Sequence, residues 1–176
     1  MIFSMSVGFL LLLSGVMKML TPNSAANLFV ELGLNSFQLS KLLGILFSIV
    51  EIFLAISLFL VSESLLVNII SVIIFSIFLL VNIKSLTNKE KKSCSCFGKL
   101  LKTELGYGGI VQSLIMLIIV FLNIGTEKPG FLMLVNNKII LHELILVVIV
   151  SVLGTITLIF IRSTIDTINN NLLGKL

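Results

Sequence analysis

Residues 42–61 read LLGILFSIVEIFLAISLFLV, and residues 65–83 read LLVNIISVIIFSIFLLVNI. Each stretch is long enough to cross a bilayer, because a transmembrane helix needs about 20 mostly apolar residues. The tripeptide SES at 62–64 is all that separates them, which predicts a tight antiparallel hairpin of two membrane helices. This hairpin indicates an all-α membrane protein.

Three further segments, 2–20, 108–123 and 139–161, have the same character, so we expect a bundle of five transmembrane helices. The composition agrees: 57% of the 176 residues are hydrophobic and 11% are charged, whereas soluble domains average about 45–50% and about 25%. The apolar excess must face lipid. This excludes a soluble enzyme, a nucleic-acid-binding domain and a disordered chain, and it predicts one integral membrane domain over residues 1–176.

The segment Thr21–Ser40 predicts a short amphipathic helix in the membrane interface, between the first two spans. Pro22 follows Thr21, as at a helix start, and Leu28 and Phe29 contribute an apolar face. Residues 2–20 lack a positively charged leading region and a small-residue cleavage site. We therefore expect a retained first span rather than a cleaved signal peptide.

The loop at 84–107, between the third and fourth spans, carries both cysteines, Cys94 and Cys96, in the motif CSCFG. Nearby positive charge favours the reactive thiolate, and a disulfide across one residue closes a small, strained and easily reduced ring. We predict a redox-active pair. The residues that support it by charge or by allowing a tight bend are Lys91, Lys92, Gly98 and Lys99.

Two other interpretations of the cysteines stay open, namely a pair of unlinked thiols and a metal site. Zinc usually takes four ligands, and the one histidine, His142, opens the fifth span on the opposite side of the membrane. We therefore expect no metal. No cofactor motif is recognised either; a quinone is compatible with a membrane redox component, but no residue pattern supports one.

Glu51 lies near the middle of the second span, where a charge costs about 2.5–3.5 kcal/mol. It is either a proton-relay or ligand-binding group, or a protonated acid that is hydrogen-bonded to a neighbouring helix. Lys18, near the end of the first span, is a partner only if its side chain extends well into the membrane. The uncharged candidate partners are Ser14, Asn68, Gln112 and Ser113.

Three segments between about Phe9 and Phe121 resemble a known family. SGVMKML followed by TP is similar to the end of the first helix of DoxX-like membrane proteins, and Glu51 stands at the acidic position of their second helix. CSCFG resembles the C-x-C-F-G segment of MauE, the methylamine-utilisation membrane protein in that group. Ser95 stands where glycine is expected. The resemblance implies a four-helix DoxX-like core, to which this chain adds a C-terminal helix.

The resemblance also implies work with a thioredoxin-like partner, in disulfide formation or maturation of an exported, cysteine-containing protein. The small subunit of methylamine dehydrogenase is such a protein, although no spacing here points to methylamine. The chain would then be a thiol–disulfide oxidoreductase or its non-enzymatic accessory. The alternative is a small transporter or scaffold in which Glu51 is the polar centre and the cysteines are incidental.

The charge pattern and this function disagree on orientation. Ten of the twelve basic residues fall on the side of the first loop, the third loop and the C-terminus, which predicts a cytoplasmic location. Six of the ten lie in the cysteine loop, and without them the bias is four against two. Because cytosolic thiols are kept reduced, we expect this loop to face outward from a bacterial cytoplasmic membrane. The ten residues are Lys18, Lys41, Lys84, Lys89, Lys91, Lys92, Lys99, Lys102, Arg162 and Lys175.

Overall fold

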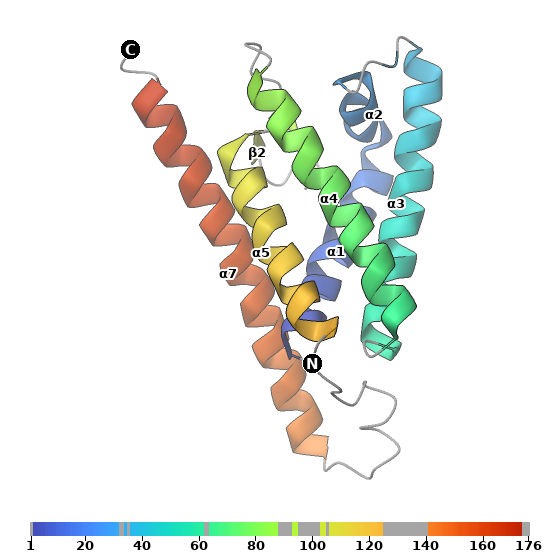
Figure 1. Cartoon of the computed structure of the whole chain (residues 1–176), viewed down its shortest axis with the longest axis vertical. Coiled ribbons are helices and arrows are strands. Elements are labelled where there is room, and N and C mark those ends of the chain that lie inside the picture. Colours follow the sequence, from blue (N-terminus) through green and yellow to red (C-terminus); the bar gives the residue numbers. More distant parts are fainter. Residues whose placement is uncertain are drawn as a thin grey trace.

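The computed structural model describes residues 2–31, 34, 36–61, 64–87, 93–94, 103–104, 106–124 and 141–173, and it shows a helical bundle (Figure 1). Five of the described helices are long and apolar enough to cross a membrane, so the predicted five-span bundle is confirmed. In chain order the elements are α1 (Ile2–Leu20), α2 (Pro22–Glu31), α3 (Phe37–Leu60), α4 (Leu65–Thr87), β1 (Ser93–Cys94), β2 (Thr103–Glu104), α5 (Tyr107–Ile124) and α7 (Leu141–Leu173).

Three helices run further than the sequence predicts, and each predicted boundary lay next to a charged residue. α4 ends at Thr87 rather than at 83, and so includes Lys84. α3 begins at Phe37 rather than at 42, and so includes Lys41. The spanning part of α7 is Ile145–Asn169, past the predicted end at 161. The prediction stopped before Arg162, but this side chain is buried between helices, and a buried, partnered charge does not end a span.

α1 packs closely against α3 because of a glycine. A Cβ atom on Gly15 would lie 2.8 Å from Ile52 Cγ1 and 3.0 Å from the backbone oxygen of Ser48, so only glycine allows this approach. This register sets the end of α1, Leu20, roughly level with Phe47 of α3. The ten residue steps of α3 from Phe37 to Phe47 therefore extend about 15 Å beyond the end of α1, at a rise of 1.5 Å per residue.

α2 packs along the part of α3 that extends beyond the end of α1. The rings of Phe29 and Phe47 meet edge to face, with centroids 6.0 Å apart. Thr21 is the single residue between α1 and α2: its N–H and hydroxyl donate to the Met17 oxygen at 3.1 and 2.8 Å, and its own oxygen accepts from the Ala25 N–H at 3.3 Å. These bonds satisfy backbone groups that a helix break would otherwise expose to lipid.

Polar contacts supplement the apolar core between the helices. Thr155 of α7 donates its hydroxyl to the Ser6 oxygen of α1 at 3.0 Å, and Asn123 of α5 donates to the amide oxygen of Asn68 in α4 at 3.0 Å. Such bonds join helices in a solvent that offers no competing partners. The largest fully buried apolar side chains are Val7, Leu11, Leu58 and Phe75.

Candidate functional site

A buried ion pair joins α1 to α3. Lys18 Nζ lies 2.5 Å from Glu51 Oε1, and the two side chains are 2% and 0% exposed. Glu51 therefore faces the bundle interior rather than lipid. The sequence left its partner open between Lys18 and several uncharged groups, and the structure assigns it to Lys18.

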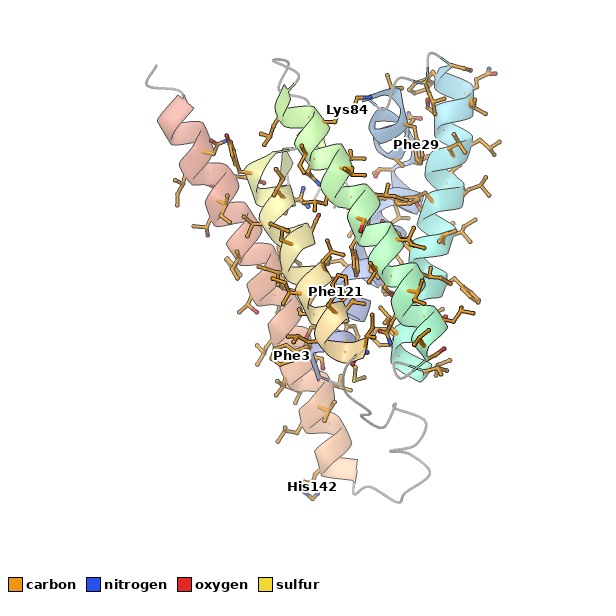
Figure 2. The ribbon with its side chains drawn as sticks, in the orientation of Figure 1. Phe3, Phe29, Lys84, Phe121 and His142 are labelled. Atoms are coloured by element: carbon orange, nitrogen blue, oxygen red, sulfur yellow. The ribbon has the colours of Figure 1, made fainter. Side chains whose placement is uncertain are left out.

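Aromatic rings enclose the ammonium group of this pair. Lys18 Nζ lies 5.2 Å from the ring centroid of Phe47 and 4.7 Å from that of Phe78. The centroids of these two rings are 5.4 Å apart, and Phe29 of α2, which is labelled in Figure 2, packs on Phe47. A cation over an aromatic face gains about 0.5–2 kcal/mol. The rings thus stabilise a charge that lipid would not, and Phe29 of α2 packs on one of them.

The spacing Gly15-x-x-Lys18 explains how the pair forms. Residues three apart lie on one face of a helix. Gly15 brings that face of α1 to α3, where a Cβ atom would be 3.3 Å from the Glu51 Cβ. Lys18 follows on the same face. Because α1 ends inside the bundle, the lysine lies close to the depth of Glu51 and does not have to extend from the membrane surface.

The cysteine loop begins where α4 ends and returns where α5 begins. β1 and β2 pair antiparallel within it, with Ser93 opposite Glu104 and Cys94 opposite Thr103. β1 lies beside α2, and β2 lies beside α7. The backbone of Cys94 is therefore held at one end of the bundle. The other predicted residues of this site, Cys96, Lys91, Lys92, Gly98 and Lys99, lie outside the described residues.

His142 is far from the cysteine loop. It lies at the start of α7, at the opposite end of the bundle from Lys84, which precedes the loop on α4 (Figure 2). A metal site that combined this histidine with Cys94 within one chain would need residues from both ends of the bundle.

A second polar cluster was not predicted. Arg162 Nη1 of α7 donates to Gln112 Oε1 of α5 at 2.7 Å, and Arg162 Nε lies 3.9 Å from Asp166 Oδ2. Asn82 of α4 is buried beside them. The sequence pattern placed Arg162 just after the fifth span, among the basic residues on the side of the C-terminus. The signal that was available is Asp166, four residues later, which lies on the same helical face as a counter-charge.

The fold and these sites define a multi-pass helical membrane protein with a buried Lys–Glu pair and a C-x-C loop at one end. A family model described as methylamine utilisation protein MauE matches residues 1–125, and the chain belongs to this family. No curated protein and no solved structure matches the chain. The matched residues include α1 through α5, whereas α7 lies beyond them.

Proposed function

We propose that the chain is the membrane component of a thiol–disulfide exchange system that uses Cys94 and Cys96. In this role it assists disulfide formation or maturation of an exported protein, together with a thioredoxin-like partner. Membership of the MauE family is consistent with a membrane redox role. The observation that carries the proposal is the loop itself: its C-x-C motif begins in a strand that pairs with β2 and lies against α2.

The proposed reaction is one exchange with balanced electrons. A thiolate of the partner attacks the Cys94–Cys96 disulfide and forms a mixed disulfide, and one cysteine of the chain leaves as a thiolate. The second partner thiolate then attacks the mixed bond. The partner becomes a disulfide, and the chain keeps two electrons and, after proton uptake, two thiols. The lysines of the loop favour this chemistry because positive charge stabilises the leaving thiolate.

The buried pair would serve this function by positioning. Lys18 and Glu51 fix α1 to α3, and the rings around the ammonium group connect the pair to α2 through Phe29. β1, which contains Cys94, lies on α2. If α1, α2 and α3 are held together in this way, the cysteine loop, whose strand β1 lies on α2, would offer its sulfurs to a partner in a reproducible geometry.

Burial of two basic residues weakens the charge argument for a cytoplasmic loop. Lys18 and Arg162 are inside the bundle, so neither acts as a topogenic loop charge. Apart from Lys84 at the end of α4 and the five lysines of the cysteine loop, two basic residues, Lys41 and Lys175, then stand against two on the other side, Lys128 and Lys138. With this balance the rest of the chain sets no orientation, and we place the loop on the outer side of a bacterial cytoplasmic membrane.

The test is capture of a mixed disulfide. A thioredoxin-like partner that retains its attacking cysteine but lacks the resolving one is incubated with the full-length chain in membranes. We expect a covalent complex that reducing agent dissolves and that the Cys94→Ser/Cys96→Ser variant cannot form. Peptide mapping of the trapped complex identifies the cysteine that the partner attacks, because a single serine variant has no Cys94–Cys96 disulfide to attack. If no complex forms and both thiols resist alkylation in the native protein, the proposal is wrong.

The transporter alternative receives less support. Lys18 donates to Glu51 Oε1, while Oε2 accepts no hydrogen bond from the described residues. Glu51, the polar centre of this alternative, does not line the cavity between α1, α4, α5 and α7. The same double serine variant separates the two functions, because transport would survive it and thiol exchange would not.

A further inference from the structure

A small, partly open cavity lies between α1, α4, α5 and α7, and neither Lys18 nor Glu51 lines it. Its volume is about 40 Å³. Besides apolar side chains, it is lined by polar groups from all four helices, namely Ser14, Asn82, Gln112, Ser113 and Arg162.

The geometry points to a binding site for about three water molecules, lined in part by Arg162 of α7. A buried water needs about 10–15 Å³ of such volume and two to four polar partners. The cavity meets both conditions. It is much smaller than the roughly 150 Å³ space that accommodates a benzene ring, so its size selects water over an aromatic ligand.

Asn82 supplies the strongest sign of a missing partner. Its side chain is 5% exposed, and its amide nitrogen donates to the Phe78 oxygen at 2.8 Å. Its amide oxygen accepts no hydrogen bond from the described residues. Leaving a buried acceptor unsatisfied is costly, and a bound water is the usual remedy.

The charge in the cavity is already balanced. Arg162 has Asp166 as its counter-ion one turn later on α7 and Gln112 as a hydrogen-bond acceptor. An anionic ligand would add an uncompensated charge to a region that is otherwise neutral. A neutral occupant that both donates and accepts hydrogen bonds fits this lining.

Two consecutive glycines at the start of α5 bring the surrounding helices together. A side chain on Gly108 would collide with Asp166, and one on Gly109 would collide with the amide group of Asn82. α4 and α7 therefore approach the first turn of α5, close to the helix ends that flank the cysteine loop. Since α7 lies beyond the matched residues 1–125, the water site joins the MauE-like core to an added helix.

Two methionines allow a controlled test. Met116 lines the cavity, whereas Met5 lies elsewhere in the bundle, and both are 4% exposed. Brief X-ray radiolysis of the full-length protein in lipid nanodiscs generates hydroxyl radicals wherever water is present. These radicals convert nearby methionine to its sulfoxide, which mass spectrometry quantifies.

We expect Met116 to be oxidised several-fold faster than Met5. In Asn82→Leu, which removes the unpaired acceptor at similar volume, the rate at Met116 should fall to that at Met5. Equal rates at the two methionines in the unmodified protein would show a dry cavity and overturn the inference. The comparison needs no variant to fold and does not involve the cysteines, so its outcome is independent of the proposed thiol chemistry.

Discussion

Removal of the Lys18 ammonium should destabilise the bundle strongly, because it leaves Glu51 buried without its counter-ion. At 2.5 Å the attraction between the two charges is about 7 kcal/mol with an effective dielectric constant near 20. Part of this offsets the desolvation of both groups. Breaking a buried pair by removing one partner costs about 3–5 kcal/mol. We therefore expect Lys18→Met to lower the free energy of unfolding by about that amount.

Replacement of both partners should be far less harmful. In Lys18→Met/Glu51→Leu no charge remains in the apolar interior, and such replacements are often neutral or even stabilising. The double variant should thus recover most of the loss caused by Lys18→Met alone. Lys41→Met is the matched control, since it removes a lysine near the start of α3 and should change stability by less than about 0.5 kcal/mol.

The assay is equilibrium unfolding of the full-length protein in mixed detergent micelles, followed by the helical signal. A double-mutant cycle gives the coupling energy between Lys18 and Glu51 directly. The reasoning is refuted if Lys18→Met costs no more than Lys41→Met, or if the two single substitutions simply add in the double variant.

Three further outcomes are expected. Gly109→Ala should cost about 1–3 kcal/mol in the same unfolding assay because Asn82 must move, whereas Gly106→Ala, which has ordinary contacts, should be nearly neutral; equal effects would contradict the packing. Arg162→Met should cost about 1.5–3 kcal/mol, because Gln112 loses a charged donor at 2.7 Å; an unchanged unfolding curve would count against it. Both cysteines should react with a membrane-impermeant maleimide in intact, reduced cells, and reaction only after lysis would place the loop in the cytoplasm.

Hydropathy alone was enough to predict the five spans, since a continuous run of about 20 apolar residues has few other uses. It predicted the residue at which α1 ends, Leu20, but not how deep in the bundle this end lies, nor how far α7 continues past 161. α1 ends deep because α2 continues along α3, and α7 extends because Arg162 has partners on α5 and on its own helix. Both outcomes depend on contacts between segments far apart in the chain.

In the candidate site, too, one feature could be predicted from the sequence and others could not. Glu51 was recognisable as an interior group because an acid in the middle of a span must find a partner. Its pairing with Lys18 depends on the register of two helices, which Gly15 fixes by close contact with α3 and which no local pattern reveals. The cavity between α1, α4, α5 and α7 requires the positions of four helices at once, so the sequence offered no sign of it.

The most direct test of the central claim is a redox titration of Cys94 and Cys96 in the full-length protein in nanodiscs. Samples are equilibrated at a series of thiol–disulfide potentials, and free thiols are counted by mass-tagged maleimide. We predict that the two thiols titrate together as one two-electron couple, with a midpoint above about −300 mV, the range of exchangeable rather than structural disulfides. Two thiols that stay free at every potential, or a bond with a midpoint well below that value, would contradict it.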